Sequence, residues 1–238
     1  MDIVRFVVGV LLPYVAIIVF GAGMVWRIRT WRKLASPPMT LFPAPEDARA
    51  NTRNTVKEAM LFSSLFRGDR VLWSIAWVFH VVLALIFVGH FRVFANVDRV
   101  LTGAGMSEDA IGAMSGGVGG AAGVIILILV ALLVVRRMTL QRVREITGVA
   151  DYLALGLIAV IIITGNMMRF GGEHFDLALT REYFAGLATF GNAGQAAALQ
   201  NNVFLVHLGL AFLLIMCMPF SKLLHFGGIF FTHQMVRK

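Results

Sequence analysis

Residues 79–90 read "FHVVLALIFVGH", an apolar run that contains two histidines, His80 and His90. The run lies inside a longer hydrophobic segment, about 71–95. Such a segment crosses a bilayer as a helix, because roughly 20 helical residues span the hydrocarbon core. An ionisable side chain within lipid is costly unless it has a partner. The stretch therefore predicts a membrane helix and raises the question of what its two histidines bind.

Four further segments have the same character, and the composition agrees with them. The chain of 238 residues is 58% hydrophobic and 14% charged, whereas soluble domains carry about 25% charged residues. We therefore expect an all-α integral membrane protein with five transmembrane helices in one domain, residues 1–238. The small residues of "GGVGGAAG" in the third segment favour close helix packing, and Pro13 predicts a kink in the first. The other four segments are about 4–26, 117–135, 151–168 and 202–220.

The basic residues predict the orientation of these helices. Sixteen of the 21 Lys and Arg residues lie between the first and second helices, between the third and fourth, or after the fifth. The positive-inside rule places those three segments in the cytoplasm and the N-terminus outside. This bias explains the net charge of +8 without a nucleic-acid partner. The five basic residues assigned to the other side are Arg5, Arg92, Arg99, Arg169 and Arg181.

The segment between the first two helices, residues 27–70, is the largest predicted cytoplasmic feature. Its stretch "ASPPMTLFPAP", residues 35–45, is too rich in proline for a helix. The following stretch "NTVKEAMLFSSLFRGDR", residues 54–70, has spaced apolar residues and predicts an amphipathic helix at the membrane surface. Two roles remain open for this helix, a simple surface anchor and a docking platform for a soluble subunit.

The depths of four histidines suggest two pairs. The second and fifth helices run in opposite directions, so His80 is predicted at the inner level with His225, and His90 at the outer level with His207. In regular helices, His80 and His90 are separated by about 15 Å along the axis, whereas His207 and His225 are separated by about 27 Å. A bend at Pro219 is expected to absorb this difference.

Two pairs of imidazoles at two depths favour two b-type haems held between the second and fifth helices, because histidine is a common axial ligand of haem iron. Small neighbours such as Gly89 and Gly209 are expected to give the macrocycles flat surfaces. A histidine-based proton or metal transporter is the alternative of another class, and a haem-free membrane anchor is a third. The remaining histidines, His174 and His233, are expected to be solvated, and the single cysteine, Cys217, to be buried.

At these residues the chain resembles the membrane dihaem cytochromes b, a family that includes the gamma subunit of respiratory nitrate reductase (NarI) and DsrM of the DsrMKJOP sulfur-metabolism complex. The resemblance covers most of the chain and is carried above all by "FHVVLALIFVGH", "VHLGL" and "PFSKLLH", with "FRGDR" and "WRKLASPP" closer to DsrM. It implies axial ligation by His80, His90, His207 and His225, and a place in the prokaryotic cytoplasmic (inner) membrane. It also implies a cytoplasmic iron–sulfur partner, either DsrK-like or similar to the nitrate reductase beta subunit.

The resemblance further implies that a quinone or menaquinol binds near the outer haem. Electrons would pass between that quinone and the iron–sulfur partner, so the chain would be an electron-transfer subunit of an oxidoreductase complex without catalytic residues of its own. The residues beside the outer ligand, Gly89, Phe91 and Arg92, are candidates for the quinone site. Arg169 is a candidate partner of a haem propionate or a quinone oxygen. For both arginines, anchoring at the membrane interface is the alternative.

Overall fold

The computed structural model describes residues 2–33, 48–171 and 175–225, and within these ranges all regular structure is helical. Within the described residues, five helices are long and apolar enough to cross a membrane. The predicted all-α chain with five candidate membrane helices is thus confirmed. The five helices are Ile3–Lys33, Arg70–Phe94, Glu108–Thr139, Val149–Phe170 and Asn202–Phe220.

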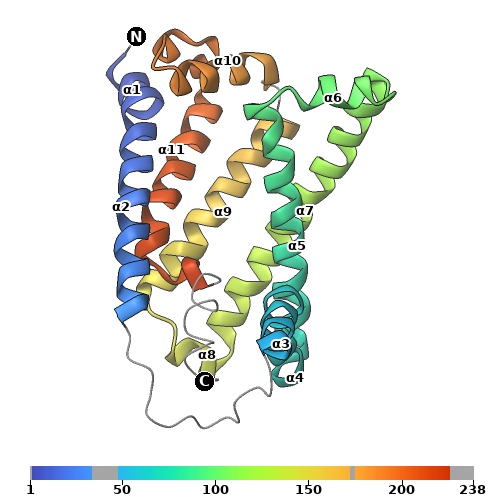
Figure 1. The fold of residues 1–238 in the computed structure, drawn as a ribbon, viewed down its shortest axis with the longest axis vertical. Helices are drawn as coiled ribbons and strands as arrows, with labels where there is room; N and C mark the ends of the chain where they lie inside the picture. Colours follow the sequence, from blue (N-terminus) through green and yellow to red (C-terminus); the bar gives the residue numbers. More distant parts are fainter. Residues whose placement is uncertain (1, 34–47, 172–174, 226–238) are drawn as a thin grey trace. The chain divides into compact units, whose positions relative to one another are not determined.

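Figure 1 labels the elements in chain order. The long helices are α2 (Leu12–Lys33), α5 (Arg70–Phe94), α7 (Glu108–Thr139), α9 (Val149–Phe170) and α11 (Asn202–Cys217). The shorter α-helices are α1 (Ile3–Phe6), α3 (Ala48–Leu61), α4 (Ser63–Gly68), α6 (Val97–Gly103), α8 (Gln141–Glu145) and α10 (Leu177–Ala188). A π-helical turn, η1 (Val7–Leu11), joins α1 to α2, and four 3-10 turns complete the set: η2 (Ala193–Gln195), η3 (Ala197–Gln200), η4 (Met218–Phe220) and η5 (Lys222–Leu224).

The chain forms two compact units. The first contains residues 1–16 and 78–214, and the second contains residues 17–77 and 215–238. The first unit therefore holds three of the four candidate ligands, and His225 belongs to the second. The grouping of all residues into one cytochrome domain stays a prediction.

The third membrane helix begins at Glu108, earlier than the predicted position near residue 117. Ser107 has extended backbone and its hydroxyl accepts a hydrogen bond from the Ala110 N–H. Glu108 and Asp109 then place negative charge in the first turn, where it stabilises the positive end of the helix dipole. These starting signals outweigh the poor helix propensity of the glycines that follow.

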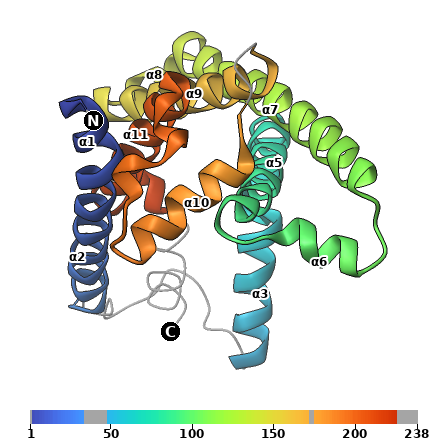
Figure 2. The ribbon, with the colours of Figure 1, turned by 90° about the horizontal axis from the view of Figure 1, so that it is seen from above.

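Helices α7 and α9 of the first unit lie side by side (Figure 1 and Figure 2), and the glycines of α7 make room for polar side chains of α9. A Cβ atom on Gly119 would lie 2.9 Å from the guanidinium carbon of Arg169, whose Nη1 donates to the Ser115 carbonyl at 2.9 Å. A Cβ atom on Gly123 would overlap the amide oxygen of Asn166, whose Nδ2 donates to the Gly123 carbonyl at 3.0 Å. The glycine-rich stretch therefore supports close packing, as predicted, and also accepts hydrogen bonds across the helix pair.

Pro13 shapes the start of the chain within the first unit. Proline has no N–H to donate to the carbonyl four residues earlier, which is that of Gly9. The hydroxyl of Tyr183, from α10, donates to this carbonyl at 2.8 Å. Gly9 is buried against Leu199, and Tyr183 is fully buried. Burial raises the pKa of Tyr183, so its hydroxyl stays protonated and able to donate.

The surface helix predicted over residues 54–70 is confirmed as helical but is divided in two within the second unit. Phe62 adopts a left-handed backbone with φ of 50° between α3 and α4. The last carbonyls of α3 are capped by indoles from α5. Trp73 Nε1 donates to the Leu61 carbonyl at 2.7 Å, and Trp77 Nε1 donates to the Met60 carbonyl at 3.0 Å. Two tryptophans thus fix this end of α3 to the beginning of the second membrane helix.

The fifth helix does not continue regularly to its last candidate ligand. The α-helix α11 ends at Cys217, η4 follows, and Ser221 has extended backbone with φ of −117° and ψ of 171°. The assumption that one regular helix carries both His207 and His225 is therefore wrong, and the axial separation of about 27 Å derived from helical rise does not apply. The expected irregularity near Pro219 is confirmed. Cys217 is exposed, contrary to the prediction that it is buried.

Candidate functional site

The structure brings together the two histidines predicted at the outer level. His90 lies near the end of α5 and His207 in the first half of α11, both in the first unit. Their ring centroids are 6.4 Å apart and their planes are within 12° of parallel. Residues separated by 117 positions in the sequence thus form a facing imidazole pair.

The Nδ1 atom of each ring lies within hydrogen-bond distance of a backbone carbonyl, and that of His207 also contacts a hydroxyl. His90 Nδ1 lies 2.7 Å from the Ile86 carbonyl of its own helix. His207 Nδ1 lies 3.1 Å from the Ile161 carbonyl and 2.9 Å from the Thr164 hydroxyl, both on α9. A ligating histidine commonly donates one ring N–H to such an acceptor and binds the metal through the other nitrogen. Nε2 is therefore the atom through which each ring would bind a metal.

The spacing of the pair fits one metal ion between the rings. Two imidazole nitrogens on opposite sides of a metal, each at about 2.0–2.1 Å, place their ring centroids about 6 Å apart. Two imidazoles could hold a haem iron, because the macrocycle supplies the other nitrogens. In the part of the chain that the structure describes, His, Cys, Asp and Glu side chains form no group of three or more able to hold a metal ion.

The two histidines predicted at the inner level belong to different units. His80 is half-buried on α5 of the first unit, and its ring meets that of Phe79 edge-on at 5.3 Å. His225 is exposed at the end of η5 in the second unit, where its Nδ1 lies 3.1 Å from the Lys222 carbonyl. Their pairing stays a prediction. The remaining two histidines, His174 and His233, lie outside the described residues.

The predicted quinone-site residues fall into two places. Gly89, Phe91 and Arg92 lie beside His90 on α5, where Phe91 is 61% exposed and a Cβ atom on Gly89 would meet open space. Arg169 instead packs on α7, as described above. Gly209, which was expected to face a haem, would bring a Cβ atom to 3.0 Å from Val8, so its small size serves packing against the first helix.

Arg92 takes part in a charge network at the end of α5. Its Nε donates to Asp98 Oδ1 at 2.8 Å, and Nη2 of Arg181 donates to Asp98 Oδ2 at 3.0 Å. The hydrogen bond from Arg92 is the main reason that the pKa of Asp98 is lowered from its usual value, and the charges of Arg92 and Arg181 add to it. Asp98 therefore ties α5 to α10 through α6.

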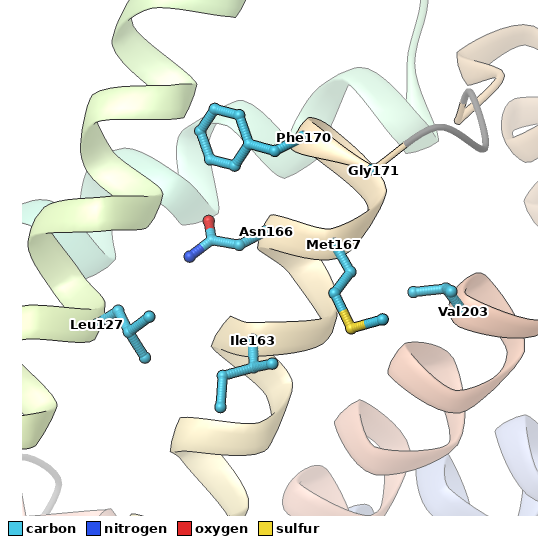
Figure 3. A pocket seen from close by; sticks show the side chains of 7 residues that line it. All are labelled: Leu127, Ile163, Asn166, Met167, Phe170, Gly171 and Val203. Carbon is cyan, nitrogen blue, oxygen red and sulfur yellow. The ribbon is translucent and has the colours of Figure 1, made fainter.

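A largely apolar cavity of about 580 Å³ lies between α7, α9 and α11 (Figure 3). The side chain of Asn166 points toward α7 and that of Met167 toward α11 (Figure 3). The cavity is adjacent in sequence to the His207 site, because Ile163 precedes Thr164 and Val203 lies one turn before His207. The sequence reasoning missed this cavity, since its single polar residue gives a weak signal within an apolar span. The lining residues are Leu127, Ile163, Asn166, Met167, Phe170, Gly171 and Val203.

Comparison with known proteins identifies the family. Residues 52–237 match the family described as nitrate reductase gamma subunit. The chain belongs to the nitrate reductase gamma subunit family. This match confirms the resemblance drawn from the histidine-containing stretches. Together with the five apolar helices, it establishes the chain as a membrane protein.

Known proteins similar to this chain align with most of its length. An Hdr-like menaquinol oxidoreductase cytochrome b-like subunit of Archaeoglobus fulgidus is 31% identical, and the alignment covers 94% of this chain and 77% of that protein. The corresponding subunit of Archaeoglobus profundus is 28% identical over 93% of this chain and 76% of its own length. The respiratory nitrate reductase 1 gamma chain of Escherichia coli is 31% identical over 64% of this chain and 69% of its own length.

Proposed function

We propose that this chain is the membrane cytochrome b subunit of a respiratory complex and exchanges electrons between membrane menaquinol and a cytoplasmic iron–sulfur subunit. The facing pair of His90 and His207 carries the proposal. The parallel rings, their spacing and the contacts at both Nδ1 atoms suit a pair of histidines that would hold a haem. Membership in the nitrate reductase gamma subunit family supports the same function.

The haem would supply one-electron transfer when bound, and the chain's own residues would hold and insulate it. His90 and His207 would hold the haem iron through their Nε2 atoms. The Ile86 carbonyl would fix the ring of His90, and the Ile161 carbonyl would fix that of His207. Because His90 lies on α5 and His207 on α11, the haem would also hold these two helices together.

A second haem, ligated by His80 and His225, completes the proposed path across the membrane. The positive-inside rule predicts that His225 and the segment containing α3 and α4 lie on the cytoplasmic side. The indole-capped end of α3 at Trp73 and Trp77 would present a defined surface there. We propose that the iron–sulfur partner docks at this surface. Of the two roles left open by the sequence, this is the docking platform for a soluble subunit.

The similarity over the whole chain favours the DsrM-like branch of the family. The relatives that match more than nine-tenths of this chain are both Hdr-like menaquinol oxidoreductase subunits, whereas the nitrate reductase gamma chain matches 64%. DsrK, the partner that the resemblance to DsrM implies, is an iron–sulfur protein related to heterodisulfide reductase (Hdr). We therefore propose a DsrK-like iron–sulfur partner. A role as the gamma subunit of a nitrate reductase is the second candidate and is supported by the family match.

The quinone site is proposed beside the outer ligand, at Gly89, Phe91 and Arg92. The open space at Gly89 and the exposed ring of Phe91 would allow a planar ring to approach His90. Arg92 would offer a donor to a quinone oxygen while its Nε stays bonded to Asp98. Arg169, which donates to the Ser115 carbonyl of α7, is proposed to contact a haem propionate.

Spectroscopy of the purified chain tests this function. We expect a b-type band in the reduced-minus-oxidised spectrum, and reduction of that band by a menaquinol analogue in membranes. Gly89→Leu would fill the open space beside His90 and should slow reduction by quinol while leaving the dithionite-reduced band unchanged. A chain that binds no haem would refute the cytochrome function. Undiminished quinol reduction in the Gly89→Leu variant would refute the quinone site alone.

A further inference from the structure

Thr164 is a buried polar residue in the second half of the apolar helix α9. Its side chain is within hydrogen-bond distance of three groups: the Val160 carbonyl at 3.0 Å, the Ile161 carbonyl at 2.9 Å and Nδ1 of His207 at 2.9 Å. The residue is 7% exposed. The first two contacts are ordinary for a threonine in a helix, whereas the third reaches a candidate ligand on another helix.

The donors and acceptors of this cluster can be assigned. A threonine hydroxyl has one hydrogen and two lone pairs. When Nδ1 of His207 is protonated it cannot accept, so the hydroxyl hydrogen goes to one of the two helix carbonyls. When Nε2 of His207 binds a metal, Nδ1 carries the proton and donates it to the Thr164 oxygen and the Ile161 carbonyl. Thr164 is then an acceptor for the ligand's N–H.

The environment of His207 differs from that of its partner ring. His90 Nδ1 lies against a carbonyl of its own helix, that of Ile86. His207 is held from α9, and the adjacent Gly165 allows the ring to lie close, since a Cβ atom there would be 3.4 Å from Cε1 of His207. The orientation of His207 therefore depends on a side chain of a helix that carries no ligand itself.

We propose that Thr164 is a positioning residue for the His90/His207 haem, and that its hydroxyl lowers the reduction potential of that haem. The inference rests on the proposed function. An acceptor on Nδ1–H makes the imidazole a more basic ligand, and a more basic ligand stabilises the oxidised iron. Removing the acceptor should therefore favour the reduced iron and raise the potential.

Three variants separate the hydroxyl from its surroundings. Thr164→Val removes the hydroxyl and keeps the side-chain shape, whereas Thr164→Ser keeps the hydroxyl. Thr180→Val is the matched control, because Thr180 is also buried but its hydroxyl donates to the Asp176 carbonyl of its own helix. Each variant is purified from membranes, its haem content is measured, and its haems are followed by potentiometric titration and by electron paramagnetic resonance of the ferric state.

We expect Thr164→Val to raise the midpoint potential of one haem and to shift the ferric resonance of that haem alone. Thr164→Ser and Thr180→Val should match the wild type. Loss of one haem in Thr164→Val with retention in Thr164→Ser would equally support a positioning hydroxyl. Unchanged potentials and spectra in Thr164→Val would overturn the inference, as would loss of haem in both Thr164 variants. A wild-type chain without haem would instead refute the proposed function.

Discussion

Removing the hydroxyl of Tyr183 should destabilise the chain, because this hydroxyl donates to the Gly9 carbonyl. Pro13 leaves that carbonyl without its usual helical donor. Tyr183→Phe keeps the aromatic ring, which packs edge to face on two phenylalanines. Its centroid is 5.0 Å from that of Phe184 and 5.9 Å from that of Phe204. The substitution removes only the donor to the Gly9 carbonyl. Pro13 has no N–H for that carbonyl, so the hydrogen bond from its usual helical donor is not available to replace the loss.

The expected magnitude follows from the burial of this bond. Hydrogen bonds between membrane helices contribute about 0.6 kcal/mol on average and up to about 1.7 kcal/mol. Leaving a buried acceptor unsatisfied costs about 1–3 kcal/mol. Because Tyr183 is fully buried and Gly9 is buried too, we expect a loss of about 1–2 kcal/mol in the free energy of unfolding.

Unfolding of the detergent-solubilised protein by sodium dodecyl sulfate measures this loss. Tyr152→Phe is the matched control, since the Tyr152 hydroxyl makes a longer bond of 3.3 Å to the Arg137 carbonyl, and it should cost less. In a Pro13→Ala background the alanine N–H becomes available to Gly9, so Tyr183→Phe should also cost less there. Equal losses in the two tyrosine variants, or no coupling to Pro13→Ala, would refute the reasoning.

Two further predictions concern helix packing and pH. Gly123→Ala should cost about 1 kcal/mol in the free energy of unfolding, because the new methyl overlaps the Asn166 amide and breaks its bond to α7. Gly117→Ala, which meets open space, should be neutral in the same unfolding assay, and equal effects would contradict the packing argument. Since the pKa of Asp98 is lowered in the folded chain, its contribution is present above the unfolded value of about 3.9 and is lost as pH falls below it. Melting temperatures from pH 5 downward should therefore fall less steeply in Asp98→Asn, and identical pH profiles would contradict this.

Hydropathy alone predicted the five membrane helices, because lipid requires long apolar segments whose backbone groups are satisfied internally. The start of α7 was misplaced because the glycines after Ser107 resemble a loop. The signal for its true start, a serine followed by Glu108 and Asp109, was present in the sequence. The end of α11 was harder, since Pro219 indicated an irregularity without showing that the backbone becomes extended at Ser221.

The sequence predicted the pairing of two histidines in the candidate site but not the residues that contact them. His90 and His207 were paired from helix direction and depth, and the structure places their rings together. Thr164 gave no comparable signal, because a single threonine in an apolar span is usually bonded to its own helix. Its contact with His207 depends on how α9 and α11 pack, which a one-dimensional pattern does not contain. The same reason explains why the bond from Tyr183 to Gly9 was missed.

Haem content per chain tests the central claim most directly. Purified wild-type protein, His90→Ala and His207→Ala are compared by the pyridine haemochrome assay, with protein quantified by amino-acid analysis. Two haems per wild-type chain and one in each variant are predicted, because both substitutions remove a ligand of the same haem and leave His80 and His225 intact. Wild-type protein without haem b, or variants that both retain two haems, would contradict the account.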